Sequence, residues 1–260
     1  MSRWRSRFEV LSLFVVFVII WEIVVRFLEV PSYIIPAPSL ILSRLADLFQ
    51  SGLIWPHLIT TGLTILSGLA LGIVAGLAFG ALIGVVPPAE RLIYPYLVAM
   101  QTVPKIAIAP LFVLWFGYGI TSKIVISALI SFFPVLVSVI SGLRAAERDQ
   151  MDMMRVFGAS RWQSFLHLRL YAALPTIFAG IEIASILAVI GAIVGEFVGA
   201  QEGLGYLITT LNFNMDVAGV FATLIILSAI GLSVHALARY LGRRMVFWRR
   251  ADEKSAVLSH

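Results

Sequence analysis

The sequence contains no cysteine and few charged residues. Without cysteine, the 260-residue chain can form no disulfide, thiolate metal site or catalytic thiol. Charged residues make up only 13% of the chain, whereas hydrophobic residues make up 60% and the mean hydropathy is +0.98. A soluble globular domain needs far more polar residues to cover a core of this size. The composition therefore predicts a membrane protein that crosses the bilayer several times.

The chain also lacks the sequence features of nucleotide hydrolysis and of metal binding. It has no G-x-x-x-x-G-K-[ST] phosphate-binding loop and no soluble segment large enough to form a nucleotide-binding domain. Its four histidines, His57, His167, His235 and His260, are scattered, and none has a neighbour at metal-ligand spacing. We therefore expect neither a catalytic residue nor a metal site in this chain.

Apolar segments long enough to cross a bilayer, about 20 residues each, recur between the charged residues. Three arginines precede the first segment, as in a signal peptide, but Trp21, Glu22 and Arg26 stand in place of a small-residue cleavage site. Glu22 and Arg26 are four residues apart, so we expect them to pair on one helix face. The sequence predicts an all-α fold with six transmembrane helices, roughly at Val10 to Leu28, Thr60 to Gly84, Leu92 to Phe116, Ile124 to Gly142, Tyr171 to Val198 and Val217 to Leu237.

The lysines and arginines are distributed unevenly between the loops. If both termini are cytoplasmic, the inside holds three basic residues at the start, Arg91, five residues from Arg144 to Arg169, and six from Arg239 to Lys254. The outside then holds only Arg44 and Lys123. Basic residues of membrane proteins concentrate in short cytoplasmic loops. The net charge of +5 therefore indicates membrane orientation and no nucleic-acid partner.

Glycine recurs at every fourth position of the second segment and returns in the fifth. Helices in a bilayer gain little from hydrophobic association and pack where small residues let their backbones approach. We therefore expect tight contacts for both helices, either inside the bundle of one chain or with a second copy. The glycines concerned are Gly68, Gly72, Gly76, Gly80 and Gly84, and then Gly191, Gly195 and Gly199.

The longest predicted cytoplasmic loop lies between the fourth and fifth segments. Residues 145–157 have the pattern of an amphipathic helix, with Met151, Met154 and Phe157 near one face. Gly158 can adopt the left-handed conformation that ends this helix. Ser160 is then placed to cap a second short helix, which contains Trp162, Phe165 and Leu166. The pattern fits a docking element, and it also fits an interfacial helix on anionic lipid.

Several stretches match the pattern of a known family. They are "YIIPAPS" (residues 33–39), "VPKIAIAPLFVLWFGYG" (residues 103–119), "GEFVGAQEGLGYLI" (residues 195–208) and the loop around Gly158. In these stretches the chain resembles the permease subunits of ATP-binding-cassette (ABC) importers. The similar group transports nitrate, sulfonates, taurine, pyrimidine precursors and riboflavin.

The cytoplasmic signature of that family has Glu-Ala-Ala, three residues, a glycine, nine residues and an Ile-x-Leu-Pro ending. Aligning Gly158 with the glycine puts Asp152-Met153-Met154 at the Glu-Ala-Ala positions. Residues 168–171, Leu-Arg-Leu-Tyr, then stand at the ending, so the chain departs from the pattern at both sites. A second Leu-Pro follows at residues 174–175, as is usual in this group.

The resemblance implies a single permease domain over residues 1–260 of a bacterial inner membrane protein, with the fold of a type I ABC importer. Its coupling loop, about residues 143–170, would seat in a separate ATPase subunit. ATP and Mg²⁺ would be bound by that partner, and this chain would hold no cofactor. A substrate-binding protein outside and a second permease, in a homodimer, complete the expected partners. The residues expected to couple to the ATPase are Asp152, Arg155, Gly158, Ala159, Ser160, Arg161 and Trp162.

Four polar residues inside the predicted spans are candidates for the translocation path. A lone cation at the bilayer centre costs roughly 2.5–3.5 kcal/mol on insertion scales, so Lys105 should face protein or water. Neighbouring prolines, which free backbone carbonyls, suggest that Gln101 and Lys105 border a cavity. The alternative for Lys105 is a snorkelling side chain at a helix break. Glu182 and Glu196 are similar candidates, although Glu196 is near enough to the outer end to be interfacial.

Two other classes of protein use comparable apolar bundles. A secondary transporter normally shows an inverted internal repeat and no docking loop, and we find no convincing repeat in this sequence. A membrane-embedded enzyme needs His, Asp or Glu clustered at helical spacing, which this chain lacks. The sequence therefore favours a non-enzymatic importer subunit, with a secondary transporter as the alternative. It does not identify the transported compound.

Overall fold

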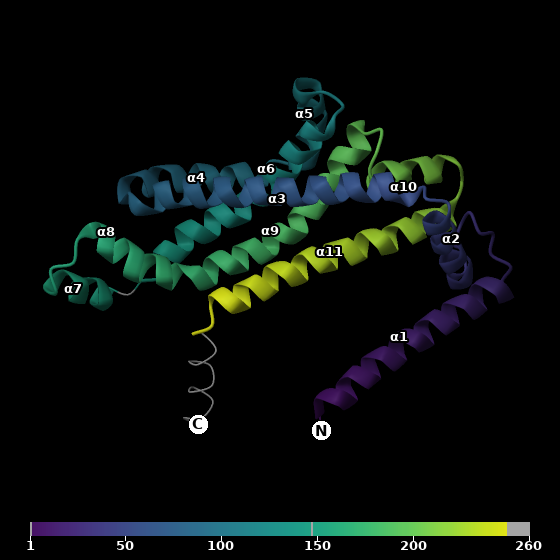
Figure 1. Cartoon of the computed structure of the whole chain (residues 1–260), viewed down its shortest axis with the longest axis horizontal. Helices are drawn as coiled ribbons and strands as arrows, with labels where there is room; N and C mark the ends of the chain where they lie inside the picture. Colours follow the sequence, from purple (N-terminus) through teal and green to yellow (C-terminus); the bar gives the residue numbers. More distant parts are fainter. Residues whose placement is uncertain (1, 147, 249–260) are drawn as a thin grey trace. The chain divides into compact units, whose positions relative to one another are not determined.

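The regular secondary structure of the chain is helical, as the sequence predicts. The computed structural model describes residues 2–146 and 148–248, and within these ranges it contains no strand (Figure 1). The helices are α1 (Ser2–Phe27), α2 (Pro38–Gln50), α3 (Ile54–Val85), α4 (Pro87–Thr102), η1 (Lys105–Ile108), α5 (Ala109–Phe116), α6 (Ile120–Leu143), α7 (Arg148–Val156), α8 (Arg161–Ser164), η2 (Phe165–Arg169), α9 (Leu170–Gly199), α10 (Leu204–Phe213) and α11 (Val217–Met245).

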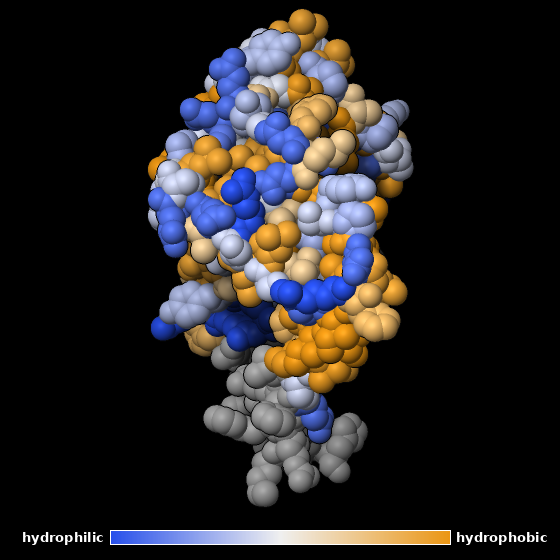
Figure 2. Space-filling model, turned by 90° about the vertical axis from the view of Figure 1, so that its right-hand side faces the viewer, coloured by the Kyte–Doolittle hydropathy of each residue, from blue (hydrophilic) through white to orange (hydrophobic). Residues whose placement is uncertain are grey.

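The structure accounts for part of the six predicted membrane spans. The described residues contain four helices that are long and apolar enough to cross a bilayer, and up to five if one bent pair forms a single span. The four are α3, α6, α11 and the continuous helix from Arg161 to Gly199. The first predicted span corresponds to α1, which is 26 residues long. The structure does not describe the side chains at the start of this helix. Hydrophobic side chains cover much of the exposed surface, as Figure 2 shows for one face.

The chain forms two compact units. The larger consists of Thr61–Gln201 and Ile230–His260, and α6 lies at its centre, between α3 and α9 (Figure 1). The five regularly spaced glycines of α3, Gly68 to Gly84, lie against α6, where they meet Ser127, Ser131, Val135, Val139 and Leu143 in turn. A Cβ atom on Gly76 would lie only 2.7 Å from the Cβ of Val135. The four-residue glycine spacing of α3 therefore serves a contact inside the chain.

Helix α9 packs against α6 through glycines as well. A Cβ atom on Gly191 would lie 2.7 Å from the Cα of Ser127, and one on Gly195 would lie 3.1 Å from the Cα of Lys123. Gly199 instead meets Val113 of α5. The hydroxyl of Ser127 donates a hydrogen bond to the carbonyl of Ala188, 2.9 Å away. The backbones of α6 and α9 therefore approach too closely for a side chain at Gly191, and a side chain at Gly195 would be tightly packed.

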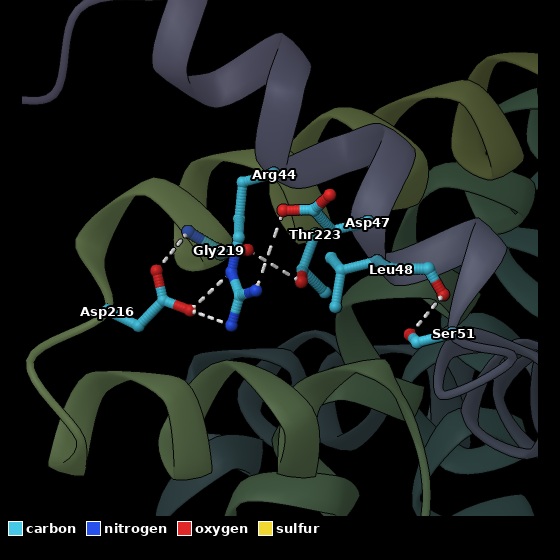
Figure 3. Close-up of polar contacts among 7 residues, drawn as sticks. All are labelled: Arg44, Asp47, Leu48, Ser51, Asp216, Gly219 and Thr223. Atoms are coloured by element: carbon cyan, nitrogen blue, oxygen red, sulfur yellow. Dashed lines mark hydrogen bonds and ion pairs between the residues drawn. The ribbon is translucent and has the colours of Figure 1, made fainter.

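The smaller unit consists of Met1–Thr60 and Glu202–Ala229. It contains α2 and α10, two helices that are too short to span a bilayer and that are not among the helices predicted from the sequence. Arg44 of α2 donates to Asp216 over 2.7 Å, and the other carboxylate oxygen of Asp216 caps α11 by accepting from the Gly219 amide at 2.9 Å (Figure 3). One of the two basic residues predicted to lie outside is therefore neutralised by an ion pair.

The first two helices of this unit are joined by a polar cluster. Glu22 pairs with Arg26 at 2.5 Å, which confirms the pairing predicted from their spacing. Ser39, near the start of α2, donates to Glu22 from both its amide and its hydroxyl, over 3.0 and 2.7 Å. These bonds hold the first turn of α2 against the end of α1. In the same unit, Trp21 contacts Phe221 with ring centroids 6.0 Å apart.

Candidate coupling loop and translocation cavity

The predicted coupling loop is a sharp elbow between two helices. Helix α7 ends at Val156, and Gly158 has a φ of +71°, which confirms its predicted left-handed conformation. The amide of Ala159 donates to the carbonyl of Met154, and that of Gly158 to the carbonyl of Arg155, both over 2.9 Å. These bonds satisfy carbonyls that the end of α7 would otherwise leave open. These hydrogen bonds fix the backbone of the elbow where it leaves α7.

The second side of the elbow is fixed by a capping box. The hydroxyl of Ser160 accepts from the Gln163 amide at 3.2 Å, and the Gln163 side chain accepts from the Ser160 amide at 2.8 Å. The predicted cap at Ser160 is therefore confirmed. Gln163 was missed, although the spacing Ser-x-x-Gln is the known signature of this reciprocal cap.

The helix after Ser160 is not the separate short helix that the sequence predicts. Helix α8 continues through the π-helical turn η2 into α9, and the three form one helix from Arg161 to Gly199. No glycine or proline interrupts residues 161–174, so the helix has no reason to end there. The elbow is therefore continuous with a candidate membrane-spanning helix.

The tip of the elbow exposes large apolar side chains. Val156 is 85% exposed, Phe157 is 79% exposed and Trp162 is 66% exposed. Met151 and Met154, expected on the same face as Phe157, are half-buried instead. Exposed apolar groups of this size in a polar segment are typical of a surface that binds another protein or a membrane.

The charged residues of the loop have two kinds of surroundings. Asp152 and Arg155 pair with each other over 2.9 Å on the exposed surface of α7. Arg155, Ala159 and Arg161 also line a cavity of about 470 Å³. Of the residues expected to couple to the ATPase, these charged ones therefore lie partly on the surface of α7 and partly in the wall of a cavity.

The third predicted span, residues 92–116, is not one straight helix. The helical parts Arg91–Thr102 and Lys105–Phe116 meet at an angle of 79°. Val103 is extended, with φ −63° and ψ 127°, because the ring of Pro104 disfavours helical backbone in the residue before it. Pro104 also has no amide hydrogen to continue the helix. The segment is therefore either a broken span or a re-entrant loop.

Lys105 lies directly after this break. Its Nζ donates to the backbone carbonyl of Gln101, 3.1 Å away, and lies 4.8 Å from the ring centre of Phe133. The amine thus donates a hydrogen bond to a carbonyl that lacks an intrahelical partner at the end of α4. The structure brings Gln101 and Lys105 together, as expected, but through the main chain of Gln101.

Lys105 also lines an apolar cavity of about 320 Å³ within the larger unit. The other walls include Phe112 and Trp115 of α5 and Phe133 of α6, so one cation faces several aromatic rings. A cavity of this volume is at the lower end of the range for small-molecule sites. Its chemistry suits a planar solute, because aromatic rings stack on flat molecules and the amine offers hydrogen bonds or charge.

The two glutamates of α9 occupy different places. Glu182 is half-buried, whereas Glu196 is only 1% exposed and accepts a hydrogen bond from Thr61 at 2.7 Å. Fourteen residues separate them, roughly 21 Å along a helix. Glu196 is therefore enclosed by the protein itself, and the two carboxylates cannot act at one position of a path.

Comparison with known proteins identifies the family. Residues 68–247 match the model of the binding-protein-dependent transport system inner membrane component. The chain is 41% identical to the formylaminopyrimidine transport permease protein ThiX of Halalkalibacterium halodurans over 250 residues, which cover 96% of this chain and 99% of the relative.

Two further relatives have different transport names. The riboflavin transport system permease protein RibX of Chloroflexus aurantiacus is 36% identical over 88% of this chain and 86% of its own length. The putative aliphatic sulfonates transport permease protein SsuC of Bacillus subtilis is 32% identical over 92% of this chain and 86% of its own length.

These matches decide between the importer and the secondary transporter. Permeases of binding-protein-dependent ABC systems are multi-pass inner membrane proteins that work with a separate ATPase and a binding protein. They carry small solutes, bind no cofactor and are not enzymes themselves. The chain belongs to the binding-protein-dependent transport system inner membrane component family, as the permease subunit of an ABC transporter.

Proposed function

We propose that the chain is an importer permease that crosses the membrane six times with both termini in the cytoplasm. On this proposal α1 forms the first span and the bent pair α4 and α5 forms the third. The uneven distribution of lysine and arginine supports this orientation. Part of that support, residues 249–260 and the side chains of residues 1–8, lies outside the described residues.

The elbow at Gly158 is the part that docks on the ATPase. The observation that carries this proposal is the combination of a fixed backbone and an exposed apolar tip. The turn at Gly158 and the cap at Ser160 hold the shape, while Val156, Phe157 and Trp162 project from it. The elbow loses little conformational entropy on binding, because its backbone is already ordered.

Motion of the elbow reaches the membrane through α9. Helix α8 continues into α9, and α9 contacts α6 through Gly191 and Gly195 at backbone distance. Close-packed helices move as bodies and are not compressed. Closure of an ATPase dimer around the elbow therefore tilts α9 together with α6.

The cavity beside Lys105 borders the translocation path. Gln101 borders the path through its backbone carbonyl, which accepts from Lys105. Glu182 and Glu196 border the path at other depths or stabilise the helices that form it. The names of two relatives specify a pyrimidine and riboflavin, and the aromatic walls of the cavity suit such planar heterocycles. We therefore propose a small nitrogen heterocycle, delivered by the binding protein, as the substrate class.

A second copy of this chain completes the permease. The glycines of α3 lie against α6 of their own chain, so the surface between copies is a different one. The proposed assembly contains two permeases in the bilayer, two ATPase subunits on the cytoplasmic side and one binding protein outside.

The proposed path is tested by uptake in vesicles that hold the complete transporter. Lys105→Met should lower ATP-dependent uptake about tenfold, a change of about 1.4 kcal/mol, whereas Lys105→Arg should preserve most of it. Lys254→Met serves as the matched control. Normal uptake by both Lys105 variants would remove this side chain from the path. Uptake by the permease alone, driven by an ion gradient, would contradict the coupling to an ATPase.

A further inference from the structure

The cavity at the base of the elbow has no part in the function proposed above. It has a volume of about 470 Å³ and three arginines line it, Arg155 of α7, Arg161 of α8 and Arg169 of η2. Its remaining walls are largely apolar and include Val85 and Phe165. A cavity with several guanidinium groups and apolar walls fits an anion that carries a hydrophobic part.

The guanidinium groups differ in how far they are already engaged. Arg155 pairs with Asp152 over 2.9 Å. Among the side chains that the structure describes, Arg161 and Arg169 form no ion pair with a carboxylate. Two positive charges in one cavity repel each other, and an anion between them removes this repulsion. Arginine binds phosphate oxygens in pairs through its planar fork of N–H donors.

The residues around the cavity also indicate its depth. Val85 is the last residue of α3, and Arg161 is the first residue of the continuous helix that runs to Gly199, so the cavity lies where two candidate membrane-spanning helices end. With α3 and the helix from Arg161 to Gly199 crossing the bilayer as proposed above, this position is the level of the lipid headgroups.

We propose that this cavity binds the phosphate of an anionic phospholipid headgroup. Arg161 and Arg169 donate to the phosphodiester oxygens, and Val85 and Phe165 border the start of the acyl chains. Basic pockets beside membrane helices on the cytoplasmic side are suited to such headgroups. The lipid then supports the base of the elbow from the membrane side, opposite the exposed tip.

The test is lipid retention by the purified full-length permease, without ATPase or substrate, in native mass spectrometry. The protein in neutral detergent is titrated with phosphatidylglycerol or with phosphatidylcholine. We expect one tightly retained phosphatidylglycerol. The double variant Arg161→Gln/Arg169→Gln should weaken this binding about thirtyfold, which corresponds to about 2 kcal/mol for two basic residues. Binding of phosphatidylcholine should be weak and unchanged.

Two further variants make the result specific. Arg239→Gln/Arg243→Gln removes the same charge from the end of α11 and should change phosphatidylglycerol binding less than twofold. Arg161→Lys/Arg169→Lys keeps the charge and should retain most of the binding, which also shows that substitution here leaves the fold intact. Equal losses in the two glutamine variants would overturn the proposal, because they would indicate unspecific charge attraction.

Other outcomes would assign the arginines to a different ligand. If inorganic phosphate at millimolar concentration displaces the lipid, the cavity is a site for the free anion and the proposal fails. If the Arg161→Gln/Arg169→Gln variant keeps its lipid but no longer co-purifies with the ATPase, these arginines meet the partner protein. Either result leaves the proposed transport function itself untouched.

Discussion

Glycine has opposite roles in two regions of the larger unit. In the bundle of α3, α6 and α9, Gly191 has no space around it, because an added Cβ would lie 2.7 Å from the backbone of α6. At the elbow, Gly158 has nothing within 4 Å of an added Cβ, but its φ is +71°. One region requires glycine for close approach, and the other requires it for backbone conformation. This difference agrees with the proposal above, in which the bundle moves as a rigid body and a partner recognises the shape of the elbow.

The largest effect should come from filling the contact between α6 and α9. We expect Gly191→Ala to destabilise the purified permease by about 1–3 kcal/mol, because the backbone atoms of Ser127 cannot move aside easily. Gly62→Ala is the matched control, since Gly62 lies in α3 with nothing within 4 Å of an added Cβ. That change should stabilise the helix by up to about 1 kcal/mol. Thermal unfolding in detergent measures both, and equal shifts would contradict the difference in packing.

A smaller and local effect should follow from Gly158→Ala. Left-handed backbone costs an alanine roughly 1–2 kcal/mol, so the elbow should distort while the bundle stays intact. Gly158→Asn should behave nearly as the natural chain, because asparagine tolerates this conformation. We expect Gly158→Ala to lower ATP-dependent uptake and co-purification of the ATPase without changing the unfolding temperature. A loss of thermal stability as large as that of Gly191→Ala would show that the two glycines do not differ as described.

The smallest effect should follow from loss of the cap. Ser160→Ala removes the acceptor for the Gln163 amide and should cost about 1 kcal/mol, whereas Ser160→Asp should preserve the cap. Hydrogen exchange of the amides of residues 161–164 should become about fivefold faster in Ser160→Ala only. Unchanged exchange would mean that the continuous helix from α8 to α9 holds this turn without the cap.

The sequence predicts these two glycine environments well, because each has a local signature. A four-residue spacing in an apolar run indicates packing, and a glycine after an amphipathic helix indicates a helix end. The Ser160 cap and the Glu22–Arg26 pair could be predicted for the same reason, since their partners lie within four residues. Contacts between residues distant in sequence could not be predicted. Examples are the pairing of Arg44 with Asp216 and the burial of Glu196 beside Thr61.

The third span shows a second limit of sequence reasoning. Its hydropathy is that of one membrane helix, and only the backbone geometry at Pro104 turns it into two helices at 79°. A proline in a long apolar segment bends or breaks the helix depending on which carbonyls find other donors. Here Lys105 donates to the carbonyl of Gln101, an interaction that becomes evident only once the break is known.

The docking of the elbow on an ATPase is tested most directly by a single cysteine at its tip, since the natural chain has none. Val156→Cys places a thiol at a position that is 85% exposed. We expect a membrane-impermeant maleimide to label it in inverted vesicles only, and the bound ATPase to protect it. Labelling from the outside, or equal labelling with and without the ATPase, would contradict a cytoplasmic elbow held by the ATPase.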